Sequence, residues 1–276
     1  MRWWIGLAAA SAFAQSFSFE PATPVQGQVL KVYGGAPAAN TRLNGRTVRL
    51  FPQSDGRLLG LMPVGTLTKP GVYDLEWLDG DNAIHHEQLR IASAHFKRQN
   101  IILSKRLSAL HSTPEERQTV AAFLRTVSAE RFWQEPLEAP IPGCITSPFG
   151  VMRLHNGKPT GDYHAGLDQR GAFGSPVHAV ASGVVKIVEP FELRGGTVAI
   201  DHGQGLESIY LHLSNFAAKE GDHVERGAVI GYVGSSGRST APHLHWTLYA
   251  SGVPINPLQW MKLTPCTAPA AKTGTK

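Results

Sequence analysis

The sequence is poor in cysteine, because Cys144 and Cys266 are the only two among 276 residues. Neither lies in a C-x-x-C pair, which argues against thiol redox catalysis and against a zinc site built from cysteines. Charged residues are also few, at 17% against 42% hydrophobic residues. A chain with so little charge and so much apolar material is expected to fold around a core.

Long hydrophobic runs are scarce as well. The run from Trp3 to Ala14 has 12 residues, fewer than the roughly 20 that cross a bilayer as a helix. It follows a basic N-terminus and ends in an A-x-A motif, which is the pattern of a cleaved secretory signal. We therefore expect a signal peptide over residues 1–14 and an exported mature chain without a transmembrane segment.

Export changes how the two cysteines are interpreted. In an oxidising compartment a single pair favours one disulfide. It would close a loop of about 120 residues and stabilise the fold by about 4–5 kcal/mol if chain entropy dominates. Two free thiols are the alternative. The net charge of +5 is compatible with nucleic acid, anionic lipid or an acidic polymer outside the cell as a partner.

Glycine and proline are plentiful, with 29 and 19 residues, and they indicate many turns and a mainly β protein. Within residues 15–97, Tyr73, Leu75 and Trp77 alternate with acidic residues, the period of a half-buried strand. A turn and a returning strand through residues 88–91 predict a hairpin. We expect this region to be a small β-sandwich.

Residues 98–140 are interpreted as a helical connector. Thr113-Pro114-Glu115-Glu116 is a capping-box start with proline at the first helical position. An apolar face predicts an amphipathic helix up to about Val127. Residues 141–263 are again rich in glycine turns and strand-like segments, and residues 264–276 are expected to be a flexible tail.

Histidine is the residue whose distribution points to chemistry, because eight of the twelve lie between residues 151 and 250. In His243-Leu-His245 the two imidazoles of a strand point to one face. His164-x-x-x-Asp168 adds a carboxylate. Two histidines and one aspartate match the ligand set of a catalytic zinc site, which keeps a position open for water. Spacing alone leaves open which histidine binds metal and which acts as acid or base.

A cupin-type sheet is another setting for an H-x-H pair on a strand. There a glutamate typically follows within a few residues, whereas residues 246–249 here are Trp, Thr, Leu and Tyr. The sequence therefore disfavours that architecture.

A longer series of motifs surrounds these histidines. In chain order they are Ser147-Pro-Phe-Gly150 with Arg153, His164-x-Gly166-x-Asp168, Gly174-Ser-Pro-Val177, Ser182-Gly183-Val184-Val185, His202-Gly203, Tyr210-x-His212-Leu213-Ser214, Gly221-Asp222-x-Val224-x-x-Gly227, and Ile230-Gly231-x-x-Gly234-x-x-Gly237-x-Ser239-x-x-Pro242-His243-Leu-His245. With this series, residues 147–258 resemble the LytM/lysostaphin-type zinc metallopeptidases. The departures, at Leu211, Ala241 and Trp246, remove no ligand.

The resemblance implies roles for five residues. His164, Asp168 and His245 would bind Zn²⁺, while His212 and His243 would orient water, stabilise the oxyanion and move protons. It also implies a compact, mostly antiparallel β domain over residues 141–263, with a groove across the zinc. The activity implied is hydrolysis of peptide bonds in bacterial peptidoglycan.

Two alternatives to this function remain open. Some relatives have lost ligands and activate cell-wall amidases without cleaving the wall, although this sequence keeps all five positions. A glycyl-glycine endopeptidase is the other. Because we see no wall-anchor motif, choline repeat or separate C-terminal binding domain, we favour a periplasmic enzyme that cuts D-Ala–diaminopimelate cross-links. We expect a monomer, and without basic-aromatic interleaving we expect no nucleic-acid partner.

The remaining features carry weaker expectations. His202 matches a family turn and is interpreted as structural, whereas His155, His178 and His223 are interpreted as groove-rim, packing or solvated residues. The N-terminal sandwich resembles the accessory domain of some exported family members. One hypothesis is that it and the connector partly cover the groove, and the rival hypothesis is that it docks on the anionic wall.

Overall fold

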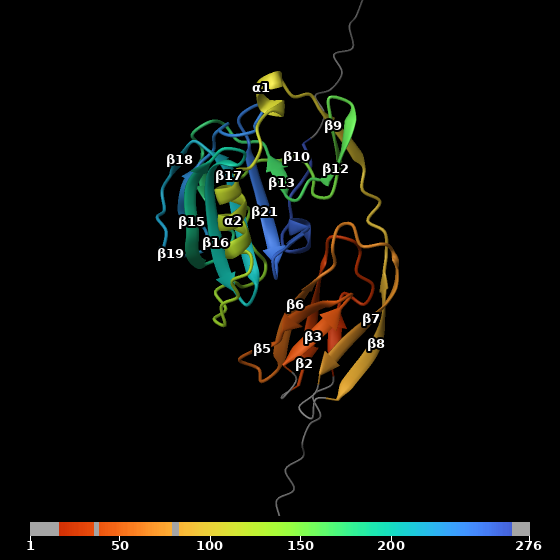
Figure 1. The fold of residues 1–276 in the computed structure, drawn as a ribbon. Helices are drawn as coiled ribbons and strands as arrows, with labels where there is room; N and C mark the ends of the chain where they lie inside the picture. The colour runs from red at the N-terminus through yellow and green to blue at the C-terminus, as the bar shows by residue number, and fades with distance from the viewer. Residues whose placement is uncertain (1–16, 36–38, 79–82, 267–276) are drawn as a thin grey trace, which may run out of the picture.

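The computed structural model describes residues 17–35, 39–78 and 83–266, and it is mainly β, as the sequence predicted. Figure 1 shows an N-terminal pair of sheets in orange and a larger C-terminal sheet in green to blue, joined by a connector. The predicted signal peptide, residues 1–14, and most of the predicted tail lie outside the described residues. Within those ranges, no helix is long and apolar enough to cross a membrane.

The N-terminal region is the predicted β-sandwich. Its two sheets have the strand orders β1-β2-β6-β5 and β4-β3-β7-β8. The strands are β1 (Ser18–Glu20), β2 (Val29–Gly34), β3 (Asn40–Leu43), β4 (Arg46–Arg49), β5 (Phe51–Pro52), β6 (Leu58–Pro63), β7 (Gly71–Leu78) and β8 (Ile84–Ile91). Strands β7 and β8 pair antiparallel and confirm the predicted hairpin. Leu30 and Met62 of one sheet share a buried core with Leu75 and Leu89 of the other, so this region has a core of its own.

The connector begins with a strand that the sequence analysis did not predict. Strand β9 (Arg98–Ile101) pairs in parallel with β11 (Met152–His155) of the C-terminal region. Two helices follow, the short α1 (Lys105–Ser108) and the longer α2 (Pro114–Phe123). The connector is therefore part of the C-terminal fold and not only a link to it.

Helix α2 has the predicted start and an earlier end. The Oγ1 atom of Thr113 accepts a hydrogen bond from the N–H of Glu116 at 3.1 Å, which is the predicted N-cap. The helix ends at Phe123, four residues before the predicted end. Val120 and Phe123 pack against the C-terminal sheet, whereas Val127 is 44% exposed, so the apolar contact that supports the helix stops at its last turn.

An antiparallel sheet organises the C-terminal region. Its strand order is β10-β13-β21-β17-β16-β15-β19, with β22 beside β21, and two smaller sheets have the orders β12-β11-β9 and β14-β20-β18. The elements are β10 (Ile145–Ser147), β12 (Lys158–Tyr163), β13 (Leu167–Gln169), β14 (Pro176–His178), β15 (Gly183–Phe191), β16 (Gly195–Gly203), β17 (Leu206–Leu213), β18 (Asn215–Phe216), β19 (His223–Val224), β20 (Val229–Tyr232), β21 (Leu244–Ala250), β22 (Val253–Ile255) and the 3-10 helix η1 (Pro257–Gln259). Ile209 of β17 packs with helix α2, whereas the next residue, Tyr210, joins the main core on the other face. The sheet is thus covered on both sides.

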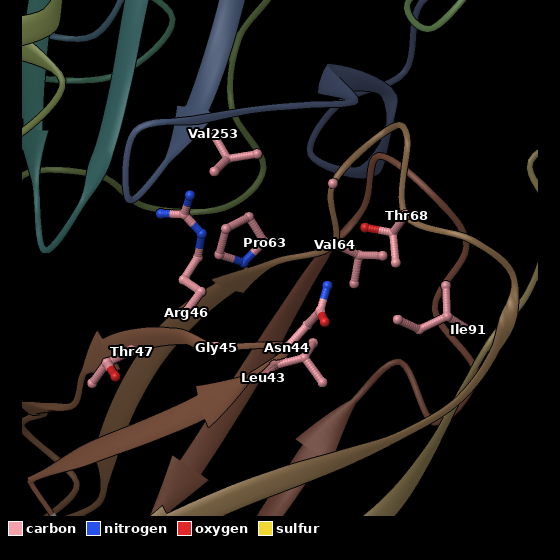
Figure 2. Close-up of a pocket in the computed structure, with 11 residues that line it drawn as sticks. Leu43, Asn44, Gly45, Arg46, Thr47, Pro63, Val64, Thr68, Ile91 and Val253 are labelled. Atoms are coloured by element: carbon pink, nitrogen blue, oxygen red, sulfur yellow. The ribbon is translucent and has the colours of Figure 1, made fainter.

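Direct hydrogen bonds hold the sandwich against the C-terminal region. The side-chain amide of Gln259 bonds to both the N–H and the carbonyl of Val29, at 2.8 and 2.7 Å. A cleft of about 580 Å³ opens nearby, and Figure 2 shows Arg46 and Pro63 of the sandwich on one side of it and Val253 on the other. The guanidinium of Arg46 also donates to the carbonyl of Ser251 at 3.2 Å. The two regions therefore meet through polar contacts beside an open cleft and through Val29, Leu59 and Leu61, which are buried in the main core of the C-terminal region.

One disulfide joins Cys144 and Cys266, as the pair of cysteines predicted. It links positions 122 residues apart. The N–H of Ile145 donates to the carbonyl of Thr264 and the N–H of Cys266 donates to that of Ile145, both at 2.9 Å. The disulfide therefore fastens the end of the described chain beside strand β10.

Glu207 in β17 is a buried carboxyl whose oxygens have no hydrogen-bond partner of good geometry. Burial, and then the nearby carboxylate of Asp201, raise its pKa well above the usual value, although the N–H of Gly252 opposes this shift. Ionisation of Glu207 therefore costs folding free energy.

We expect the wild-type protein to become less stable as the pH rises, and we expect Glu207→Gln to remove this pH dependence. The pKa of Glu207 is higher in the folded than in the unfolded state. The protonated carboxyl therefore contributes its full stability below the unfolded-state pKa, and this stability is lost as the pH rises through the folded-state pKa. The slope can reach about 1.4 kcal/mol per pH unit. Urea unfolding between pH 4 and 8 should show wild type and variant converging at low pH, with the variant more stable at high pH. Glu189→Gln, at an exposed position of the same sheet, is the control, and parallel curves for wild type and Glu207→Gln would contradict the expectation.

Candidate metal centre and groove

Two neighbouring strands place the predicted metal ligands side by side. Strand β13 pairs antiparallel with β21, and the register sets Asp168 opposite His245. His164 lies in the loop that leads into β13. Residues opposite each other on paired strands have side chains within contact distance. The register therefore brings together two side chains that are 77 positions apart in the sequence.

The ligand atoms of these three residues converge on one point. The Nε2 atom of His164 lies 3.0 Å from Oδ1 of Asp168 and 3.0 Å from Nδ1 of His245. The distance from Nδ1 of His245 to Oδ1 of Asp168 is 2.8 Å. Over residues 17–35, 39–78 and 83–266 this is the one cluster of three such side chains that could hold a metal ion.

The outer nitrogen of each candidate ligand histidine faces an oxygen. Nδ1 of His164 lies 2.9 Å from the carbonyl oxygen of Pro148, and Nε2 of His245 lies 3.2 Å from the hydroxyl of Thr247. When these outer nitrogens carry the protons, the inner nitrogens present lone pairs toward the Asp168 carboxylate, which is the state that metal ligation needs. Three electron-rich atoms without a proton between them are stabilised by a divalent cation, and zinc takes this donor set. The residues present therefore fit zinc.

Burial and neighbouring groups set the pKa values of the cluster. Burial opposes ionisation of Asp168, but the adjacent imidazoles of His164 and His245 outweigh it and hold the Asp168 pKa well below its usual value. Burial lowers the pKa of His245 to about 4, although the hydrogen bond and the charge of Asp168 act to raise it. Burial, then His245 and His243, lower the pKa of His212 to about 3. At neutral pH the aspartate is ionised and His212 and His245 are neutral, the states that ligation and proton acceptance need.

The structure also brings His212 and His243 to this cluster. Nδ1–H of His212 donates to the carbonyl of Ser236 at 2.9 Å, and Nδ1–H of His243 donates to the carbonyl of Ala241 at 2.7 Å. The two ring centroids are 5.1 Å apart, and Nε2 of His243 lies 3.7 Å from Oδ1 of Asp168. Each ring is anchored through Nδ1, so its Nε2 is available to a bound molecule.

A second layer of polar side chains supports the ligands and includes the connector. The hydroxyl of Ser147, 3.2 Å from Nδ1 of His164, donates to Oε1 of Gln99 at 2.7 Å. The guanidinium of Arg153 donates to the same oxygen at 2.5 Å and lies 3.5 Å from Oδ2 of Asp168. Gln99 belongs to β9. The unpredicted strand of the connector therefore contacts His164 through Ser147 and Asp168 through Arg153.

The cluster opens into a groove of about 310 Å³. It is lined by the five predicted site residues, by other residues of the C-terminal region, and by Ile101 and Leu103 of the connector. No described residue of the sandwich lines it. In this structure the groove is therefore bordered by the connector and not by the N-terminal sandwich.

The other four histidines of the C-terminal region lie outside the candidate metal cluster. His202 is fully buried and bonds to a backbone carbonyl and a serine hydroxyl. His178 bonds to a backbone carbonyl, and His223 packs edge-on against an aromatic ring. His155 lines the groove, which agrees with the groove-rim alternative considered from the sequence.

Several groove residues were not identified as site residues from the sequence, among them Tyr163, Arg194 and Arg238. The guanidinium of Arg194 pairs with the buried carboxylate of Glu116 in α2 at 2.5 Å. That contact joins positions 78 residues apart, so no local pattern announces it. Arg238 did carry a signal, because it lies in the glycine-rich segment five residues before His243.

Comparison with curated proteins finds relatives of the C-terminal region. The DD-carboxypeptidase/endopeptidase Mpg of Neisseria meningitidis is 44% identical over 121 residues, which is 44% of this chain and 28% of that protein. The peptidoglycan DD-endopeptidase ShyA of Vibrio cholerae is 38% identical over 115 residues, which is 42% of this chain and 27% of the relative. The chain thus spans about a quarter of the length of these relatives.

Family models and solved structures extend the comparison. The model of peptidase family M23 matches residues 162–257, a range that includes all five predicted site residues. A crystal structure from Pseudomonas aeruginosa described as a peptidase M23 is 30% identical, has a TM-score of 0.68, and covers 86% of this chain and 95% of that one. With its metal-ligand cluster and this agreement over nearly the whole chain, the protein belongs to peptidase family M23, a family of zinc metallopeptidases.

Proposed function

We propose that the chain is an exported zinc-dependent endopeptidase that hydrolyses peptide cross-links of bacterial peptidoglycan. Family membership and the relatives named as peptidoglycan endopeptidases support this activity. The observation that carries it is the meeting of His164, Asp168 and His245 with His212 and His243 along one groove. In this proposal residues 141–263 carry the catalysis and the connector contributes one wall.

The chain's own residues supply binding and proton transfer. His164, Asp168 and His245 would hold zinc, which when bound polarises a scissile carbonyl and makes water more acidic. A neutral imidazole of His212 or His243 can accept a proton through Nε2, because its Nδ1 is committed to a backbone carbonyl. Once protonated, that ring can stabilise charge on the carbonyl oxygen or return the proton to the leaving amine.

Within this activity we favour D-Ala–diaminopimelate bonds and a periplasmic location. The two relatives described above carry the names of DD-peptidases, which supports this choice over a glycyl-glycine bond. The positive net charge of the chain would assist its approach to an anionic wall.

Mass spectrometry of purified peptidoglycan after incubation tests the proposal. We expect cross-linked stem peptides to be converted to monomers with a new D-Ala carboxyl and a new diaminopimelate amine. A chelator should stop this conversion, and added zinc should restore it. Because zinc would polarise the scissile carbonyl and make water more acidic, no cleavage is expected without the metal.

Two other outcomes would identify the alternatives. Cleavage confined to peptidoglycan with glycine cross-bridges would identify a glycyl-glycine endopeptidase. Release of whole stem peptides only when a cell-wall amidase is added, with no bond cut by the protein itself, would identify an activator and reject the proposed activity.

A further inference from the structure

Three arginine side chains line the groove, and two of them have partners. Arg153 bonds to Gln99 and lies beside Asp168, and Arg194 is paired with Glu116. The guanidinium of Arg238 forms neither an ion pair nor a hydrogen bond with any side chain that the structure describes. It is thus the groove cation whose charge remains available to a bound molecule.

The backbone of Arg238 is fixed relative to the catalytic candidates. Its N–H donates to the carbonyl of Leu193 at 2.9 Å. Ser236, two residues before it, accepts the hydrogen bond from Nδ1 of His212, and Ser239, the residue after it, lies 3.3 Å from Nδ1 of His243. One short segment therefore holds both imidazoles and presents Arg238.

Arg238 lies where two hollows meet. It lines the groove that contains the metal-ligand cluster, and it lines an adjoining hollow of about 320 Å³ together with His155 and Thr160. Asp162 is the carboxylate whose charge acts on it most, but Asp162 is exposed and is not within ion-pair distance of it. Because Arg238 is half-buried, an anion that entered here would be attracted in a partly water-excluded site.

We infer that Arg238 binds a substrate carboxylate beside the scissile bond and so determines which cross-link is cut. This inference rests on the proposed function. In a D-Ala–diaminopimelate cross-link, the carbon that bears the acylated amine also bears a free carboxylate, whereas an internal glycyl-glycine bond has no such group. A guanidinium recognises a carboxylate with two parallel hydrogen bonds, so Arg238 selects the first bond type.

The test compares two synthetic cross-linked peptides that differ only in this group, a free carboxylate in one and a carboxamide in the other. The zinc-loaded wild-type chain is expected to cut the acid with a kcat/KM about 10- to 100-fold above that for the amide. In Arg238→Gln the ratio should fall to about one through loss on the acid alone. Arg238→Lys should be intermediate, because lysine offers a point charge without the planar fork.

Arg226→Gln is the matched control, since Arg226 pairs with Glu138 outside the groove, and it should keep the wild-type ratio. Zinc content and thermal unfolding of each variant separate a folding defect from lost recognition. A wild type that cuts acid and amide equally, or an Arg238→Gln variant that keeps the preference, would overturn the inference.

A binding measurement separates this inference from the proposed function. Dissociation constants for both peptides are measured by calorimetry on His212→Ala, with and without Arg238→Gln. A preference for the acid that disappears with Arg238 supports the inference even if the wild type cuts neither peptide, in which case the proposed activity alone fails. Equal binding of the two peptides, or no binding, overturns it.

Discussion

His245→Ala is expected to lose zinc and hydrolysis together. Nδ1 of His245 lies 2.8 Å from Oδ1 of Asp168 and 3.0 Å from Nε2 of His164, so its removal leaves two of the three proposed ligands. The loss of affinity should exceed the roughly 10- to 100-fold that removal of an outer-shell partner costs. Elemental analysis after dialysis and peptidoglycan turnover are the two measurements.

Thr247→Val provides a graded comparison for the same ligand. The hydroxyl of Thr247 lies 3.2 Å from Nε2 of His245, and valine keeps the shape without the oxygen. We expect a smaller drop in zinc affinity, about 10- to 100-fold, with residual turnover when zinc is in excess. Stoichiometric zinc and full turnover in His245→Ala would remove this residue from the metal site.

His212→Ala is expected to separate metal binding from catalysis. The His212 ring is anchored to Ser236, its centroid lies 6.0 Å from that of His245, and the candidate metal cluster does not include it, so we place it beside the proposed ligands and not among them. A positioned acid–base group contributes about 10²- to 10⁴-fold to rate. Zinc content should stay at the wild-type level while turnover falls by about that factor.

The backbone of His212 calls for a second variant. Its φ is +63°, a left-handed conformation that asparagine tolerates better than most residues. His212→Asn should therefore keep the local fold and show the same loss of turnover. Loss of zinc in both variants would place His212 among the ligands, and full turnover in either would remove it from the catalytic machinery.

Local patterns predicted much of this structure. Alternation at Tyr73, Leu75 and Trp77 predicted a strand, and the following turn predicted its hairpin partner. The capping sequence at Thr113 predicted the start of α2. The spacing of His243 and His245 predicted two imidazoles on one side, and both line the groove. These features rest on contacts within a few residues, so the sequence order displays them directly.

Other features depend on partners far away in the chain. Strand β9 has no alternating apolar pattern, and it exists because residues 98–101 find an edge at β11. The end of α2 depends on where the sheet beneath it stops offering apolar contacts. Gln99 and Arg194 enter the site through residues 48 to 78 positions distant, and nothing in their own neighbourhoods marks them.

By itself, the sequence determined the mainly β class, the sandwich, the disulfide pairing and the family motif that names five site residues. The tertiary structure decided how those residues act together. It set Asp168 opposite His245, turned two ring nitrogens toward one carboxylate, anchored two further rings through backbone carbonyls, and left the guanidinium of Arg238 without an ion-pair partner among the described side chains. The reason is physical: a motif specifies which groups are present, but charge, tautomer and availability depend on what the fold places within a few ångströms of each group.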